Sequence, residues 1–287
     1  MQKRQVAREI SYAASARTRA GRTLIRTVEN LTGRPGLIRR ARGYELEMGA
    51  GADFWSVMMA RYGLGLDVLG GSLDAIPREG PLVVVANHPF GILDGLVLGH
   101  VLSVARGEFR VVAHQVFGKA AELERVILPI SFDGTKEGQK LNLATRAEAL
   151  GYLRGGGCVG IFPGGTVSTA LTPKGRPLDP RWRTFTAKMI AKSGATVVPV
   201  YFHGANSRRF QRASHLHYTL RMALLISEFK ARVGAKVPLV VGDPIPPEEI
   251  AARAGDARAL MDWLRARTYA LSPEPVAEAG YGYEFEG

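Results

Sequence analysis

The stretch Pro81-Leu-Val-Val-Val-Ala86-Asn87-His88-Pro89-Phe90-Gly91-Ile92-Leu93-Asp94-Gly95 joins an unbroken apolar run to a cluster of polar and turn-forming residues. Residues 81–86 are continuously apolar and rich in valine, which is typical of a strand buried on both faces of a parallel sheet. Residues 92–105 then follow a helical pattern. The sequence therefore predicts a strand, a short loop and a helix, with Asn87 and His88 at the carboxyl end of the strand, where α/β folds place their sites.

The same alternation continues toward the C-terminus. Further strands are predicted at 110–114, 126–130, 158–162, 196–202 and 236–241, and helices at 136–154, 182–193, 215–233, 247–254 and 257–270. Strands that alternate with helices indicate an α/β fold with a central, mostly parallel (mixed) sheet flanked by helices. Before this domain, residues 7–31 read as a basic helix that ends at Gly33, and residues 54–69 form a second apolar segment.

We therefore divide the chain into three parts: a basic, amphipathic N-terminal helical region (1–72), an α/β domain (73–271) and a loose acidic tail (272–287). Residues 1–43 hold eleven Lys and Arg against two Glu, so they carry most of the net charge of +12. Such a surface suits an anionic partner: a membrane, an acidic protein or nucleic acid. A solvated helix pair with its arginines outside is the alternative.

No run approaches the roughly 18 apolar residues of a membrane span. The segment 54–69 could pack on the core, or it could lie in a membrane interface and, together with the basic region, hold the protein on an anionic bilayer from one side. We therefore expect a peripheral protein at the cytoplasmic face of the inner membrane. Nucleic acid is not the expected partner, because residues 1–43 contain a single aromatic residue, Tyr12, and no DNA-binding or RNA-binding motif is present.

The loop after the first strand contains a possible catalytic pair. A histidine at the end of a strand and an aspartate a few residues later, His88 and Asp94, can form a dyad in which the carboxylate orients the imidazole. The other ring nitrogen is then free to take a proton from a hydroxyl group. By spacing alone, a turn whose polar side chains cap the next helix explains the same residues.

A second cluster, Phe162-Pro-Gly-Gly-Thr-Val-Ser168, also follows a predicted strand. The amides of Gly164 and Gly165 could face an anion or oxyanion, and the hydroxyls of Thr166 and Ser168 could donate further hydrogen bonds. A plain glycine-rich turn is the alternative. No P-loop or G-x-S-x-G motif is present, and neither the histidines nor the single cysteine have metal-ligand spacing, so we expect no metal.

Together these clusters resemble the glycerolipid acyltransferases, the family of the lysophosphatidate acyltransferases. The family pattern is Asn-His-x4-Asp, then Phe-Pro-Glu-Gly-Thr-Arg-Ser, then a Val-Pro-Val strand. This chain has Asn87-His88…Asp94, Phe162-Pro-Gly-Gly-Thr-Val-Ser168 and Val197-Val-Pro-Val-Tyr201 in the same order, and the resemblance covers about residues 75–270. It implies that His88 and Asp94 are catalytic and that Asn87, Gly164, Gly165, Thr166 and Ser168 contact substrate.

The departures from this pattern point to a divergent haemolysin-like subgroup, which resembles enzymes that make ornithine lipids and other aminolipids. His88 and Asp94 are separated by five residues instead of four, and Gly164 and Val167 replace the family's Glu and Arg. In the family that arginine is linked to the acceptor's phosphate, so a lyso-aminolipid acceptor fits this chain better. Other cations could bind a phosphate instead, and the candidates are Arg181, Arg183, Arg208 and Arg209.

The resemblance implies an O-acyltransferase of membrane-lipid biosynthesis. It would move a fatty acyl group from acyl-ACP or acyl-CoA, as co-substrate, to the hydroxyl of a lyso-lipid, with no other cofactor. A basic surface would also suit acyl carrier protein, which is acidic. Two alternatives stay open at this point: a non-catalytic lipid-binding relative, and a nucleic-acid-binding protein.

Overall fold

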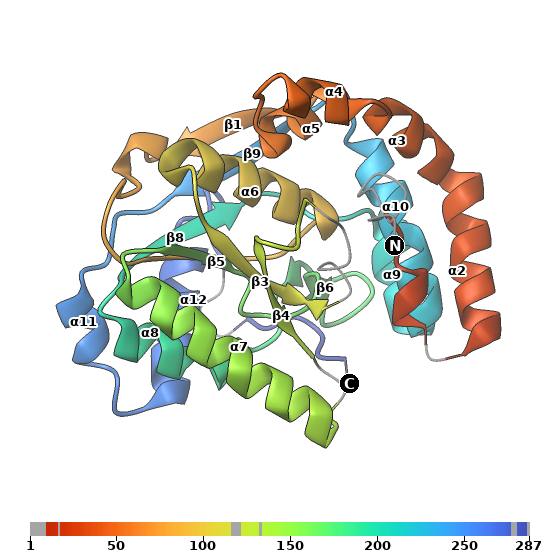
Figure 1. Cartoon of the computed structure of the whole chain (residues 1–287). Helices are drawn as coiled ribbons and strands as arrows, with labels where there is room; N and C mark the ends of the chain where they lie inside the picture. The colour runs from red at the N-terminus through yellow and green to blue at the C-terminus, as the bar shows by residue number, and fades with distance from the viewer. Residues whose placement is uncertain (1–9, 17, 116–121, 132–133, 277–279, 286–287) are drawn as a thin grey trace.

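The computed structural model describes residues 10–16, 18–115, 122–131, 134–276 and 280–285 (Figure 1). Of the regions discussed above, residues 1–9 and 17 of the basic region and residues 277–279 and 286–287 of the tail lie outside the described residues. The N-terminal elements are η1 (Ala13–Ser15), α2 (Arg19–Thr32), α3 (Arg34–Ala41), α4 (Tyr44–Gly49), α5 (Phe54–Tyr62), β1 (Gly65–Gly70) and η2 (Leu73–Ala75). The others are β2 (Leu82–Ala86), α6 (Ile92–Arg106), β3 (Arg110–His114), β4 (Ile127–Ile130), α7 (Lys136–Arg154), β5 (Cys158–Ile161), β6 (Thr169–Ala170), β7 (Pro177–Leu178), η4 (Thr184–Thr186), α8 (Ala187–Ser193), β8 (Thr196–Phe202), α9 (Arg208–Leu216), α10 (Tyr218–Ala231), β9 (Lys236–Val241), α11 (Pro247–Ala251) and α12 (Ala257–Tyr269).

The centre of the molecule is a seven-stranded sheet in the order β1-β9-β8-β2-β5-β3-β4. All neighbouring strands are parallel except β8 and β9, which pair antiparallel. The predicted α/β class with a mostly parallel, mixed sheet is therefore confirmed. The short strands β6 and β7 form a separate antiparallel pair that the sequence analysis did not predict.

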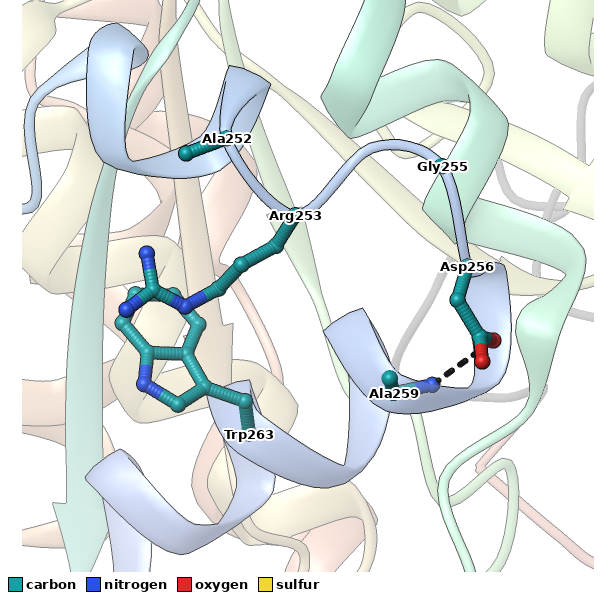
Figure 2. A pocket seen from close by; sticks show the side chains of 6 residues that line it. All are labelled: Ala252, Arg253, Gly255, Asp256, Ala259 and Trp263. Carbon is teal, nitrogen blue, oxygen red and sulfur yellow. Dashed lines mark hydrogen bonds between the residues drawn. The ribbon is translucent and has the colours of Figure 1, made fainter.

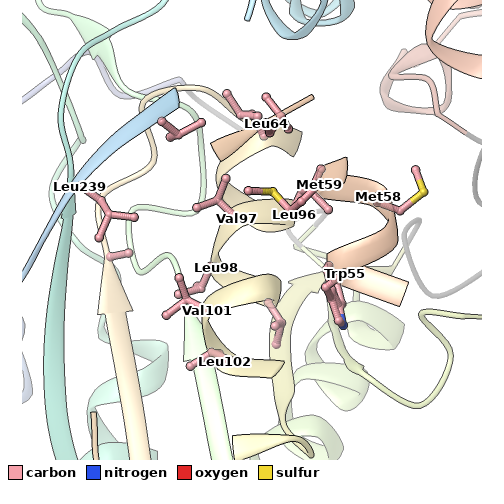
Figure 3. Close-up of a cluster of buried hydrophobic side chains, with 14 of the residues drawn as sticks. Trp55, Met58, Met59, Leu64, Leu96, Val97, Leu98, Val101, Leu102 and Leu239 are labelled. Carbon is pink, nitrogen blue, oxygen red and sulfur yellow. The ribbon is translucent and has the colours of Figure 1, made fainter. Parts of the chain in front are cut away.

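Two apolar layers cover the two faces of this sheet. Strand β2 is buried throughout, and its residues alternate between the layers. Leu82 and Val84 face the layer that contains α5 and α6, whereas Val83 and Val85 face the layer that contains α7, α8 and α12. Figure 3 shows the first layer, where α5 and α6 pack side by side over the sheet. A continuous apolar strand needs a cover on each face, and the flanking helices supply it.

The N-terminal region differs from the prediction in two places. Of the helix expected at 7–31, the part from Arg19 to Thr32 is helical, and the described residues 10–16 contain a 3₁₀ turn instead. Gly33 ends the helix as expected. The apolar segment 54–69 is not one element but α5 followed by β1. Because β1 pairs with β9, it belongs to the main sheet although it precedes the expected boundary at residue 72.

Burial excludes α5 from contact with a bilayer. Most of its side chains lie in the core, where Trp55 packs against α6 so closely that a methyl group at Gly99 would clash with the indole ring (Figure 3). Of the two alternatives for the segment 54–69, its helical half therefore follows the first and packs on the core. Among the described residues, no helix is both long and apolar enough to cross a bilayer.

The described part of the C-terminal tail is not loose. The amide of Gly282 donates to the carbonyl of Asp179, just after β7, and the amide of Tyr283 donates to the carbonyl of Thr169 in β6. The ring of Phe285 lies under the guanidinium of Arg221 at 4.3 Å. These contacts hold the tail on the molecule near the glycine-rich loop, and they were not predictable from its acidic composition.

Candidate active site

The strand order brings the two predicted motifs together. Strands β2 and β5 are parallel neighbours with Val85 opposite Ile161, so the loops that follow them start side by side. Strand β8 flanks β2 on the other side and contributes its own carboxyl end, at Phe202. The site thus lies at the carboxyl ends of adjacent parallel strands, as expected for an α/β fold.

The imidazole of His88 and the carboxylate of Asp94 form the predicted pair. Nδ1 of His88 lies 3.0 Å from Oδ2 of Asp94, which is fully buried. Nε2 of His88 has no hydrogen-bond partner among the described residues, and the side chain keeps 19% of its exposure. The ring of Phe162 stacks on the imidazole at a centroid distance of 4.3 Å. One nitrogen is therefore oriented by a carboxylate while the other stays open to a ligand.

Asp94 also organises the loop that bears it. Its Oδ2 accepts hydrogen bonds from the amides of Phe90 at 2.7 Å and of Gly91 at 3.0 Å, at the start of α6. Gly91 has φ +86° and ψ −127°, a conformation that residues with a Cβ rarely adopt. This turn absorbs the extra residue between His88 and Asp94. A longer spacing than the family pattern is thus compatible with a formed pair.

Burial dominates the electrostatics of Asp94. It raises the pKa of this carboxyl above its ordinary value, whereas His88 and the two amides oppose the rise. The guanidinium of Arg232, which lies 3.8 Å above the ring of Phe90, also interacts with Asp94. A carboxylate in a dry site interacts more strongly with a neighbouring imidazolium than it would in water.

The side chain of Asn87 forms hydrogen bonds within the protein and does not face the open part of the site. Its Nδ2 donates to the carbonyl of Phe202 at 2.9 Å, and its Oδ1 accepts from the amide of the same residue at 2.6 Å. The side chain is buried, and both of its polar groups are used. The expectation that Asn87 contacts substrate is therefore corrected: it joins the end of β8 to the end of β2 beside His88.

Some hydrogen-bonding groups of the glycine-rich loop are bonded within the protein, and others are available to a ligand. The amide of Gly165 donates to the carbonyl of Phe162 at 3.0 Å, so it is not available to an oxyanion. The amides of Gly164 and Thr166 have no acceptor among the described residues. The hydroxyl of Ser168 is buried and donates to Asp179, so this group is structural as well.

Asp179 is a central residue of the site that the sequence analysis missed. Its Oδ1 accepts from the amide of His88 at 3.1 Å and from the hydroxyl of Ser168 at 2.5 Å. Its Oδ2 accepts from the indole nitrogen of Trp182 at 2.9 Å. The amide of Ser168 in turn donates to the carbonyl of His88 at 2.7 Å. A fully buried carboxylate thus binds the two motif loops together, and no sequence motif marks it.

Arg221 of α10 holds the glycine-rich loop from another side. Its guanidinium donates to the carbonyl of Val167 at 2.7 Å and to the hydroxyls of Thr166, Thr169 and Ser214. Burial lowers its pKa to about 10. The arginine occurs on the apolar stripe of its helix, and that position was the signal the sequence analysis could have used.

The candidate arginines lie in different places. Arg181 pairs with Asp262 at 2.9 Å on the surface, and Arg208 and Arg209 are exposed in the first turn of α9. Arg183 lines a cavity of about 240 Å³ that reaches Phe162 and Gly165. Arg183 therefore shares a cavity with the glycine-rich loop.

A second hollow, of about 320 Å³, lies apart from this site. Figure 2 shows it between α11 and α12, where Arg253 lies over the ring of Trp263 at 4.1 Å and Asp256 accepts from the amide of Ala259. None of its lining residues belongs to the two motif loops. Its polar groups are used in a stacking contact and a helix cap, so we assign it no part in the chemistry.

The chain is similar to known lyso-lipid acyltransferases. The chain is 28% identical over 204 residues to a lyso-glycine lipid O-acyltransferase of Phocaeicola vulgatus, covering 68% of this chain and 70% of that protein. It is 27% identical over the same length to the lyso-glycine lipid O-acyltransferase of Bacteroides thetaiotaomicron, covering 68% and 71%.

A solved structure, the 1-acyl-sn-glycerophosphate acyltransferase PlsC of Thermotoga maritima, aligns with a TM-score of 0.41 at 16% identity, over 88% of this chain and 85% of that one. An acyltransferase family model matches residues 51–277, which include both motif loops and the whole sheet. The resemblance to the glycerolipid acyltransferases is thereby confirmed, and the chain belongs to the acyltransferase family.

Proposed function

We propose that this protein transfers an acyl group from a thioester, acyl-ACP or acyl-CoA, to the hydroxyl of a lyso-aminolipid. The observation that carries the proposal is the pair formed by the partly open imidazole of His88 and the buried Asp94. The acceptor class is supported by two independent facts. Valine replaces the family arginine at position 167, and two relatives are named lyso-glycine lipid O-acyltransferases.

In the proposed reaction, Nε2 of His88 takes the proton of the acceptor hydroxyl while the hydroxyl oxygen attacks the thioester carbonyl. The C–S bond of the resulting tetrahedral intermediate then breaks, and the imidazolium returns its proton to the leaving thiolate. Asp94 stabilises the imidazolium between the two steps. The amides of Gly164 and Thr166 are the groups that we assign to the oxyanion. Neither an acyl-enzyme nor a further cofactor is required.

We assign the acceptor's headgroup to the side of the site that contains Arg183. A glycine headgroup ends in a carboxylate, and the planar guanidinium matches that group in shape and charge. Arg183 is exposed at the rim of the cavity beside Phe162, and Phe162 is in contact with His88. Arg183→Gln is expected to raise the KM for the acceptor and to leave the KM for the thioester unchanged.

An acyl-transfer assay with purified protein tests the proposal. The donors are labelled acyl-ACP and acyl-CoA, and the acceptors are lyso-glycine lipid, lyso-ornithine lipid and lysophosphatidate. His88→Ala should lower kcat by at least about 10²-fold, the contribution of general base catalysis. His100→Ala is the matched control, because His100 lies in α6 against Ser56, outside the motif loops.

Each outcome of that assay decides one part of the proposal. Product from a lyso-aminolipid that depends on His88 supports both the acceptor and the base. Product from lysophosphatidate alone would overturn the acceptor class. A folded His88→Ala protein with wild-type rates would overturn the catalytic pair, and no product from any acceptor would favour a non-catalytic lipid-binding protein.

We also propose that the outer face of α2 and α3 rests on an anionic membrane at the cytoplasmic face. With α5 buried, the exposed side chains of this face include several arginines and two leucines of α2, Leu24 at 45% and Leu31 at 81% exposure. The exposed arginines are Arg19, Arg22, Arg39, Arg40 and Arg42. Each basic residue near an anionic surface contributes about 1 kcal/mol to binding.

Sedimentation with lipid vesicles tests this surface. The double variant Arg39→Gln/Arg40→Gln should bind phosphatidylglycerol vesicles more weakly than the wild type, and binding should weaken with salt. The control is Lys136→Gln/Lys140→Gln, which removes two exposed charges from α7, on the other side of the molecule (Figure 1). Equal loss of binding in both variants would show that net charge, not the face of α2 and α3, governs the interaction.

A further inference from the structure

We propose that Tyr12, in the N-terminal segment before α2, is a positioning residue of the active site. Its hydroxyl holds the first turn of α6 and, through that turn, the alignment of Asp94 with His88. The kinetic part of this inference rests on the proposed function, whereas its structural part does not. It makes the basic N-terminal region a component of the catalytic site and not only a membrane anchor.

The first observation is a contact between segments far apart in sequence. The hydroxyl of Tyr12 accepts a hydrogen bond from the amide of Ile92 at 3.0 Å. A Cβ at Gly91 would lie 2.9 Å from the same oxygen, so the hydroxyl is packed directly against the turn that precedes α6. The preceding amide in this turn, that of Gly91, donates to Asp94. Tyr12 and Asp94 therefore hold consecutive amides of one turn.

The second observation is that the segment itself is anchored. Glu29 of α2 is fully buried, and its two carboxylate oxygens accept from the hydroxyl of Ser11 and from the amide of Tyr12, each at 2.6 Å. The guanidinium of Arg34 donates to the carbonyl of Ile10 at 2.8 Å. A buried carboxylate with two short hydrogen bonds is costly to disrupt, so the position of Tyr12 depends on α2.

The third observation is that the same segment contacts the second motif loop. Tyr12 and Ala13 belong to an apolar cluster with Val167 of the glycine-rich loop and with Met222 and Leu225 of α10. Burial raises the pKa of Tyr12, so its phenol stays neutral and accepts from an amide without adding negative charge beside Asp94. The N-terminal segment thus packs against both loops that carry the catalytic groups.

The substitution Tyr12→Phe isolates the hydroxyl. It keeps the ring in the apolar cluster and removes the acceptor of the Ile92 amide. The first turn of α6 then loses one of its fixed amides, and Asp94 loses a neighbour that limits its movement. We expect kcat to fall between about 10-fold and about 10²-fold, the effect of a small misalignment, while both KM values stay within about twofold.

Two measurements that do not need turnover accompany the kinetics. The low-field proton resonance of the Nδ1–H of His88 reports on its pairing with Asp94, and we expect it to shift or broaden in Tyr12→Phe. Deuterium exchange in a peptide that covers residues 88–98 should become faster. Glu29→Gln should produce changes in the same direction, because it weakens the anchor of the segment.

The matched control is Tyr44→Phe. Tyr44 is buried, and its hydroxyl donates to Glu122, so this bond joins two segments outside the motif loops. It should lose thermal stability but keep the wild-type kcat, resonance and exchange at 88–98. Equal effects of the two variants would reduce Tyr12 to a stability role and overturn the proposal, as would an unchanged resonance and exchange in Tyr12→Phe.

Failure of the proposed function is distinguishable from failure of this inference. If the wild type acylates none of the acceptors, the resonance and the exchange still show whether Tyr12 aligns the pair. If the wild type is active and His88→Ala is not, a Tyr12→Phe protein with wild-type kcat overturns the positioning role alone.

Discussion

Replacement of Asp179 by asparagine tests whether this residue joins the two motif loops. The carboxylate accepts from two fixed donors, the amide of His88 through Oδ1 and the indole N–H of Trp182 through Oδ2. An asparagine side chain has the same shape but only one oxygen, so one of these two N–H groups faces an NH₂ group instead. A buried donor without an acceptor costs about 1–3 kcal/mol. The hydroxyl of Ser168 can rotate and adds little.

The free energy of unfolding of Asp179→Asn should therefore fall by about 1–3 kcal/mol. Urea denaturation followed by tryptophan fluorescence measures it, and kcat should fall as well, because the backbone of His88 loses a support. Asp262→Asn is the control, since Asp262 pairs with the exposed Arg181. A loss below about 0.5 kcal/mol, the range of ordinary surface substitutions, would refute the assignment of Asp179 as a structural centre.

Three further predictions concern packing, pH and an excluded residue. Gly99→Ala should lower the free energy of unfolding by about 1–3 kcal/mol, because its methyl group would clash with the ring of Trp55. Gly95→Ala in the same helix has free space around the new methyl group and should raise the free energy of unfolding by about 0.5–1 kcal/mol. Thermal unfolding compares the two variants. Burial raises the pKa of Asp94, so the native state binds a proton there at higher pH than the unfolded chain. The free energy of unfolding of the wild type should therefore rise relative to that of Asp94→Asn as pH falls from about 7 to about 4. Urea unfolding at each pH measures this trend, and a constant difference between the two proteins would contradict it. Arg181→Ala should keep kcat and both KM values within about twofold, and a larger change in the acyl-transfer assay would restore Arg181 as a site residue.

Local patterns were enough to predict most of the α/β core. The strands β3, β8 and β9 and the helix α7 have the bounds expected from the sequence, at 110–114, 196–202, 236–241 and 136–154. Buried strands and amphipathic helices have characteristic hydrophobic patterns within a single segment, so they can be predicted without knowledge of the segments they pack against. The edge strand β1 has no such pattern, because it begins and ends with glycine and none of its residues is fully buried.

The parts of the site divide in the same way. Local patterns predicted the class of fold, the two loops at strand ends and a pairing of His88 with Asp94, because each depends on neighbours within a few residues. The three-dimensional arrangement shows that the side chains of Asn87 and Ser168 are buried in hydrogen bonds within the protein, and it revealed Asp179 as the residue that joins the loops. Asp179 reaches His88 across 91 positions.

The contribution of the N-terminal region was also decided in three dimensions. Composition showed a basic region, but the fold buries α5, adds β1 to the sheet and places Tyr12 on the turn before α6, 80 positions away. Hydrogen bonds of this kind depend on where the chain returns after several strands and helices. Hydrophobic periodicity predicts which face of each helix or strand is buried. It does not predict which residues from distant parts of the sequence will form hydrogen bonds with that element.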